Sequence, residues 1–345
     1  MTHFETDISS SEIKNIDPAG IHDVYRSWPR LAESGAEIVI RVPPGNFRRV
    51  LFLGVGGSAS AGDIISGWLS IRHRVPFFVH KGYVPDTDLR SSLAIACSAS
   101  GETKETIQMA EHAIRRGARV ITISAGGKLA ILSRKKGIPH VDVPKVAAPR
   151  YVLPFLLFST ISILCNALGL AGAGEEIKDA VREMRACVKQ VDIGVPVARN
   201  ESKRLALALL KATPKIYGST VTRGAALRFK NVLNENAKKH AFVDFAPELF
   251  HNEIEAWEEG GENFLPIFLR HAREPVSERR RFDAMVTEIT ESGVKPLQMS
   301  GAGRTDLARL VSLVYRLDFA SYYTAVWRGI DPLPTKLLDK VKRET

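Results

Sequence analysis

Between residues 48 and 143, short apolar runs alternate with segments of helical periodicity. Three of these segments predict helices near 60–72, 103–116 and 127–136. In the second, Ile107, Ala110 and Ile114 recur at intervals of three and four, and Gly117 ends the pattern. The apolar runs predict strands at 50–53, 77–80, 94–97, 119–124 and 140–143. This alternation with short connections indicates a parallel sheet covered on both faces, wound in two directions.

The second half repeats the pattern after a charged, helical stretch over 175–213. A strand from residue 215 runs into a glycine and hydroxyl loop, and a helix follows over 225–239. Further strands are predicted at 241–245, 264–269 and 295–297, with helices over 304–328 and from about 334. We therefore predict an α/β chain of two doubly wound, flavodoxin-like subdomains with parallel sheets. The first spans 1–170, a helical connection spans 171–200, and the second subdomain spans 201–345.

The stretch from residue 151 to 174 has no charged side chain and approaches the length of a membrane-spanning helix. Pro154 suits a first helical turn, polar residues interrupt the apolar run, and glycines after residue 168 end it. A buried helix of about 15 residues is the better interpretation, so we expect no membrane association. No secretory signal precedes it, and the three cysteines are too few for a disulfide framework or a zinc site. We expect a cytoplasmic protein.

The formal net charge is +10, which suits anionic ligands. The densest basic stretch is 279–281, and its one aromatic neighbour, Phe282, is too little to stack nucleic-acid bases. We interpret it as a solvated helix face and expect no nucleic-acid partner.

Two loops rich in small and hydroxyl residues stand where predicted strands pass into helices, at 54–63 and 98–106. The start of a helix offers unpaired N–H groups and a positive dipole end, which together bind phosphate. Neither loop fits the dinucleotide or Gly-Lys-Ser/Thr patterns. We therefore predict that they bind the phosphate of a small metabolite.

A carboxylate and an imidazole, Glu235 and His251, stand close in sequence within polar segments of the second half. Such a pair near a sugar phosphate could move a carbon-bound proton and open the sugar ring. The ordinary alternative is an exposed helix-end glutamate and a capping or core histidine, and the spacing alone does not decide between them.

The chain resembles the bifunctional phosphoglucose/phosphomannose isomerases, two-domain members of the sugar isomerase (SIS) superfamily. Seven motifs carry the resemblance in order: Gly54-Val-Gly-Gly-Ser-Ala-Ser-Ala-Gly-Asp63, Ser98-Ala-Ser-Gly-Glu-Thr-Lys-Glu-Thr106, Pro149-Arg-Tyr-Val-Leu-Pro154, Asn234-Glu-Asn-Ala237, Pro247-Glu-Leu-Phe-His-Asn-Glu253, Asp318-Phe-Ala-Ser-Tyr-Tyr323, and Arg328-Gly-Ile-Asp-Pro332 leading to Lys342. The resemblance implies a homodimer that acts on a hexose 6-phosphate and uses no metal or organic cofactor.

The resemblance also implies roles for single residues. The sugar phosphate would bind to Gly57, Ser58, Ser98, Ser100 and Thr103. Taken from the residues alone, the hydroxyls could equally cap helices, and a cap uses the same N–H groups that would hold a phosphate.

The implied catalytic residues lie downstream of the loops. Glu235 resembles the base that moves a proton between C2 and C1, and Arg150 resembles the group that stabilises the enediolate. His251, contributed by the other subunit, and Lys342 resemble the ring-opening residues. Thr335 matches a threonine linked with room for either C2 epimer. Without the resemblance, Arg150 would read as a surface charge and Lys342 as part of a frayed end.

One position departs from the family pattern, since Glu102 stands where an asparagine is usual. A carboxylate beside a phosphate dianion is unfavourable, so we expect Glu102 to face solvent or a helix start. Two other functions stay open: a non-catalytic sugar-phosphate regulator of the same fold, and an isomerase of another sugar phosphate, such as an amino sugar phosphate.

Overall fold

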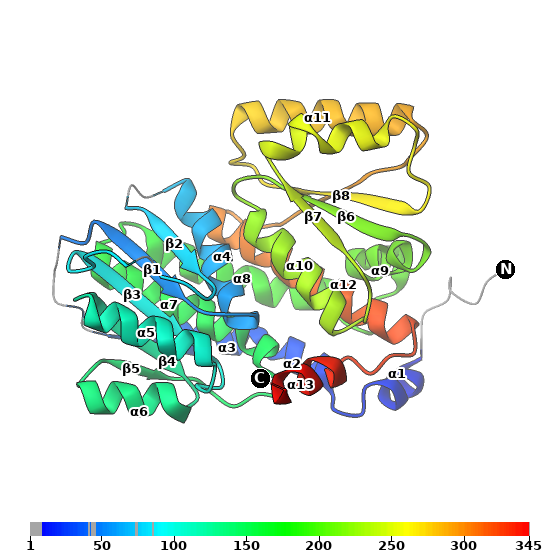
Figure 1. The fold of residues 1–345 in the computed structure, drawn as a ribbon. Helices are drawn as coiled ribbons and strands as arrows, with labels where there is room; N and C mark the ends of the chain where they lie inside the picture. Colours follow the sequence, from blue (N-terminus) through cyan, green and yellow to red (C-terminus); the bar gives the residue numbers. More distant parts are fainter. Residues whose placement is uncertain (1–8, 41, 43–45, 73–74, 85, 345) are drawn as a thin grey trace.

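The first half of the chain forms a five-stranded parallel sheet, as the pattern predicts (Figure 1). The structure is a computed structural model and describes residues 9–344 apart from 41, 43–45, 73–74 and 85. The strand order is β2-β1-β3-β4-β5, so the winding direction reverses between β1 and β3, where sheets of this kind bind ligands. The strands are β1 (Arg49–Leu53), β2 (Phe77–His80), β3 (Ser92–Cys97), β4 (Arg119–Ser124) and β5 (His140–Asp142).

Helices alternate with these strands and cover the sheet: α4 (Gly57–Ser70), α5 (Lys104–Arg115), α6 (Gly127–Lys136) and α7 (Leu153–Leu168). Helix α7, which follows the short 3-10 helix η2 (Pro149–Val152), is the charge-free segment of the sequence. The span Pro149–Leu168 is long and apolar enough to cross a membrane, but 72% of its apolar window is buried inside the protein. Because α7 packs against α4 and against α3 (Trp28–Ala36), it is a core helix, as predicted.

The second half forms a four-stranded parallel sheet of order β7-β6-β8-β9. Its strands are β6 (Thr213–Gly218), β7 (Phe242–Phe245), β8 (Phe264–Arg270) and β9 (Leu297–Ser300). Its helices are α10 (Arg223–Glu235), α11 (Val276–Glu291), α12 (Asp306–Trp327) and α13 (Lys336–Arg343). The first strand of each sheet has the next strand on one side and the third on the other, which confirms the predicted repeat of one α/β unit.

Helices α4 and α10, the first helix of each repeat, cross in close contact. A Cβ atom at Gly67 would lie 2.1 Å from the Val221 carbonyl oxygen, and one at Gly224 would lie 2.4 Å from the Asp63 backbone. Only glycine fits at either position. Asp63 of α4 meets Gly224 of α10, whereas Gly67, further along α4, meets Val221, which precedes α10. The two helices therefore run antiparallel, and the start of α4 lies near the end of α10. One hydrophobic core joins the two sheets around this crossing.

Several elements differ from the sequence predictions. The pattern did not identify the N-terminal helices α1 (Ser10–Ile16), α2 (Ile21–Arg26) and α3, nor α11. The charged connection is helical as predicted, forming α8 (Ala173–Val191), η3 (Val197–Arg199) and α9 (Glu201–Lys211). The strand predicted at 295–297 lies at Leu297–Ser300. Helix α10 ends at Glu235 and not at 239, because Lys238 adopts a left-handed φ of 51°. The domain boundaries at residues 170 and 200 stay a prediction.

Candidate active site

The two predicted phosphate loops meet at the carboxyl ends of β1 and β3. Helix α4 starts at Gly57, so Ser58 lies in its first turn, where the Ser58 hydroxyl accepts the Ala99 N–H at 3.0 Å. The Ser98 hydroxyl accepts the Gly101 N–H at 3.1 Å and lies 2.9 Å from the Thr103 hydroxyl, while Ser100 is exposed. These hydrogen bonds hold the hydroxyls and the helix starts together at one edge of the sheet, as a cradle for an anion.

The second loop is shaped by Gly101, whose φ is +75°. A Cβ atom there would lie 1.9 Å from the Gly126 carbonyl oxygen, so no other residue fits. Next to it, the Glu102 carboxylate accepts the Lys128 N–H at 3.1 Å, at the start of α6. Glu102 therefore faces a helix start, which is one of the two expected outcomes. Its negative charge interacts with the start of α6 and not with that of α5.

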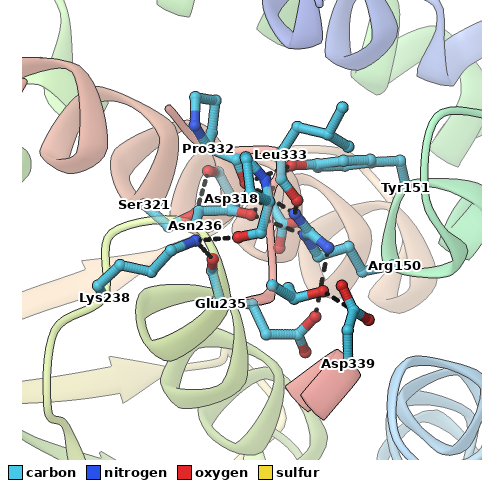
Figure 2. Close-up of polar contacts among 12 residues, drawn as sticks. Arg150, Tyr151, Glu235, Asn236, Lys238, Asp318, Ser321, Pro332, Leu333 and Asp339 are labelled. Atoms are coloured by element: carbon cyan, nitrogen blue, oxygen red, sulfur yellow. Dashed lines mark hydrogen bonds and ion pairs between the residues drawn. The ribbon is translucent and has the colours of Figure 1, made fainter. Parts of the chain in front are cut away.

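Arg150 lies directly beneath the first loop. A Cβ atom at Gly57 would lie 3.3 Å from the Arg150 Cα, so the loop and the Arg150 backbone are in contact. The Arg150 side chain is only 4% exposed, and its Nη2 donates to the carbonyl oxygens of Pro332 and Leu333, both at 2.7 Å. The sequence alone favoured a surface charge here, but the residue is buried and its guanidinium is held in one orientation (Figure 2).

Glu235 is the last residue of α10, and its carboxylate lies 3.5 Å from Nη1 of Arg150. Its side chain is 28% exposed, whereas that of Arg150 is buried, so the pair sits at the boundary between core and solvent. The Lys238 ammonium donates to the Glu235 carbonyl oxygen and, at 2.6 Å, to the Pro334 carbonyl oxygen. Desolvation is the main cause that lowers the pKa of Lys238, and the nearby positive charge of Arg150 lowers it further. Lys238 thus joins the end of α10 to the segment before α13.

A cavity of about 800 Å³ opens beside this pair, between the end of α10 and the start of α13. Glu235, Lys238, Asp331 and Thr335 supply polar groups to its lining, and Leu337 and others supply apolar ones. Thr335 precedes α13 and its hydroxyl donates to Asp339 at 3.5 Å. Within the described part of the chain, no group of three or more His, Cys, Asp and Glu side chains could hold a metal ion.

The structure brings some predicted residues together and leaves others apart. The cradle contacts Arg150, Arg150 contacts Glu235, and Glu235 lines one cavity with Thr335. His251 is exposed in the 3-10 helix η4 (Glu248–His251) and is not among the residues that line this cavity. Lys342 is exposed on α13 and is also outside that lining.

Sequence reasoning missed two residues of the site. Asn236 binds the Arg150 guanidinium at 2.9 Å and is fully buried, and Lys238 lines the cavity. Both are part of, or adjacent to, the Asn-Glu-Asn-Ala motif. Their proximity to Glu235 was the available signal, but it did not show which side chain faces inward.

The hydroxyl loop of the second repeat has a different environment. Thr220 donates its N–H to the Glu278 carboxylate at 2.9 Å and its hydroxyl to the same group. Glu278 is 7% exposed and comes from the first turn of α11. A carboxylate of the chain itself therefore occupies both donors of Thr220 in this loop.

The fold and the site define the class: a two-sheet sugar isomerase (SIS) protein with an anion cradle beside an arginine–glutamate pair. Residues 198–344 match the family described as the bacterial phospho-glucose isomerase C-terminal SIS domain. A bifunctional phosphoglucose/phosphomannose isomerase of Aquifex aeolicus is 31% identical over 302 residues, covering 86% of this chain and 90% of that protein. The chain belongs to the bifunctional phosphoglucose/phosphomannose isomerase family.

Two further comparisons describe the range of this likeness. A D-glucosamine-6-phosphate 4-epimerase of Sulfolobus acidocaldarius is 28% identical over 251 residues, covering 72% of this chain and 76% of that protein. The crystal structure of a glucose-6-phosphate isomerase like protein from Thermus thermophilus has a TM-score of 0.63 at 19% identity. It covers 98% of this chain and 100% of that one, and at this identity it shows the fold alone.

Proposed function

We propose that this chain interconverts glucose 6-phosphate and mannose 6-phosphate with fructose 6-phosphate through a cis-enediolate. The observation that carries the proposal is the Arg150–Glu235 pair, with a buried cation 3.5 Å from a carboxylate that lines a cavity. A base needs access to the substrate, and a charge that stabilises an anion acts best where water is excluded. Membership of the isomerase family supports the same reaction.

In this mechanism the phosphate anchors the open-chain sugar in the cradle of Gly57, Ser58, Ser98, Ser100 and Thr103. The Glu235 carboxylate takes the proton from C2 of the aldose, and the electrons of that C–H bond form the C1=C2 double bond while the C1 oxygen becomes negative. The Arg150 guanidinium stabilises this enediolate. The O2 hydroxyl proton passes to O1, Glu235 returns its proton to C1, and the electrons of the C1=C2 bond and of the O2–H bond form the new C1–H bond and the C2=O2 carbonyl, which gives the ketose. No step draws on a metal or an organic cofactor.

Ring opening must precede this proton transfer. In the proposal, His251 of the partner subunit and Lys342 move the protons that open the ring. Thr335, which lines the cavity, leaves room for either configuration at C2, so one base serves both aldoses. The homodimer and the cytoplasmic location stay predictions, and burial of α7 in the core is consistent with a protein that works in solution.

The direct test supplies fructose 6-phosphate to the purified chain in deuterated water and follows C2 and C1 exchange and products by NMR. We expect deuterium uptake together with both glucose 6-phosphate and mannose 6-phosphate. Binding without exchange would indicate the sugar-phosphate regulator instead. A second arm supplies glucosamine 6-phosphate, because one relative acts as a 4-epimerase on that amino sugar phosphate. If the protein converts glucosamine 6-phosphate but not fructose 6-phosphate, the proposed reaction is wrong and the substrate is an amino sugar phosphate.

The cradle gives a separate prediction. Ser98→Ala removes a hydroxyl that is 1% exposed and faces the loop, so we expect the KM for fructose 6-phosphate to rise about tenfold. The kcat should change less, because the phosphate lies away from the reacting carbons. Ser70→Ala, at the other end of α4, is the matched control and should leave both constants unchanged. An unchanged KM in Ser98→Ala, with an unchanged inhibition constant for inorganic phosphate, contradicts the cradle.

A further inference from the structure

We infer that Asn236 is a positioning residue that orients the Arg150 guanidinium and keeps its positive charge available to the substrate. The inference rests on the proposed function, in which Arg150 stabilises the enediolate. It concerns a residue for which the family resemblance implied no role, and it follows from the contacts of one buried amide.

The Asn236 side chain is completely buried and has all its hydrogen-bonding groups engaged. Its oxygen accepts from Arg150 Nε at 2.9 Å and from the Tyr151 hydroxyl at 3.1 Å. Its nitrogen donates to the hydroxyls of Tyr25 and Ser321, both at 2.9 Å. Because arginine only donates, the amide oxygen must face Arg150, so the orientation of the amide is fixed.

The contacts of Asn236 belong to a closed circuit of hydrogen bonds that begins and ends at Arg150, and Figure 2 shows its start, where Asn236 lies beside Arg150. From Asn236 the circuit continues to the Tyr25 hydroxyl, which donates to Asp318 at 3.3 Å. Arg228 donates to Asp318 at 2.6 Å and to the Arg150 carbonyl oxygen at 2.8 Å. The side chain and the backbone of Arg150 are therefore held by one buried network, which fixes the guanidinium relative to the loop above it.

The two buried arginines of this network have different partners. Arg228 is neutralised by Asp318, and both side chains are essentially unexposed. Arg150 instead donates to neutral oxygens, those of Asn236, Pro332 and Leu333. Among the ion pairs of the described residues, its only carboxylate is the partly exposed Glu235.

A neutral acceptor at position 236 thus satisfies Arg150 Nε without cancelling its charge. An aspartate would have nearly the same shape but would form a buried ion pair with the guanidinium, and less positive charge would act on the enediolate. The remaining nitrogen, Nη1, points to Glu235 and hence to the cavity.

The test is Asn236→Asp. One oxygen of the new carboxylate keeps the contacts with Arg150 and Tyr151, and the Ser321 hydroxyl can turn from the Asp318 carbonyl oxygen to donate to the other, so the variant should fold. We expect kcat for fructose 6-phosphate to fall by about 10- to 100-fold. The KM and the inhibition constant for inorganic phosphate should stay close to the wild-type values, because the cradle is not altered. Ser321→Ala removes a contact of the same amide without touching Arg150, and its kcat should stay within about threefold of wild type.

A purely structural role predicts a different result, in which kcat in Asn236→Asp and Ser321→Ala falls in proportion to the loss of melting temperature. That result, or a wild-type kcat in Asn236→Asp, overturns the inference. If Asn236→Asp does not fold, Asn236→Ser replaces it: the Arg150 nitrogen then loses its acceptor, and kcat should fall with an unchanged phosphate constant. Failure of the proposed function can be distinguished from failure of this inference, because the wild-type protein itself would then show no isomerisation.

Discussion

Replacing Glu235 with glutamine is expected to reduce kcat for fructose 6-phosphate by roughly 10⁴-fold, the upper range for loss of a general base. The amide has nearly the shape of the carboxylate but cannot take the C1 proton of this ketose or deliver it to C2. Among the described residues, Glu235 is the only carboxylate that pairs with Arg150, so no second carboxylate beside Arg150 can take over as the base. The measurement is a coupled assay for glucose 6-phosphate, together with deuterium exchange at C2 by NMR.

Binding should survive this change, because the phosphate cradle belongs to α4 and the β3 loop and not to α10. Titration of Glu235→Gln with fructose 6-phosphate should therefore give an affinity near that of the wild type. The ion pair with Arg150 is partly exposed on the glutamate side, so the free energy of unfolding should change by only about 1 kcal/mol. Glu259→Gln, at an exposed position, is the isosteric control. Near-normal turnover in Glu235→Gln assigns the base to another residue.

The sequence predicted the sheet elements well because their signal is local. Strands β1 to β5 are short apolar runs separated by helical periods, and the loops at Gly57 and Ser98 stand where strand patterns end. In a doubly wound fold these positions converge on one sheet edge, so the meeting of the two loops could be inferred from pattern and topology alone, whereas phosphate binding there stays a prediction. Helix α7 was identified in the same way, because its proline, its polar residues and the glycines that end it favoured a buried helix over a membrane span.

The core of the active site could not be predicted, because its contacts join distant segments. Asn236 binds Tyr25, which belongs to a helix that the pattern did not identify, and Arg150 binds carbonyl groups near Pro332. No local periodicity records such contacts. The end of α10 was also misplaced, since Ala237 and Lys238 suit a helix by propensity, whereas Lys238 adopts a left-handed φ of 51° through which an α-helix does not continue.

In a single chain, the proposed site beside Glu235 lacks the ring-opening histidine, His251. His251 is exposed on η4 and does not line the cavity beside Glu235, so we predict that it performs ring opening in the site of a second subunit. In a twofold dimer each subunit would give its histidine to the other site and receive one in return. The prediction is complementation: Glu235→Gln and His251→Ala dimers are each impaired, but the mixed dimer contains one complete site.

The mixed dimer is obtained by co-expressing the two variants with different tags and purifying on both. One of its sites then carries both substitutions and the other carries neither, so we expect about half of the wild-type kcat per dimer. The matched control pairs Glu235→Gln with Arg150→Met. Because Arg150 and Glu235 meet within one chain at 3.5 Å, no site of that mixed dimer is complete, and activity should stay at the level of the parents. Recovery only in the first mixture places His251 across the interface. Equal activity of both mixtures, or a single-chain mass in solution, contradicts the shared site and returns ring opening to groups of the same chain.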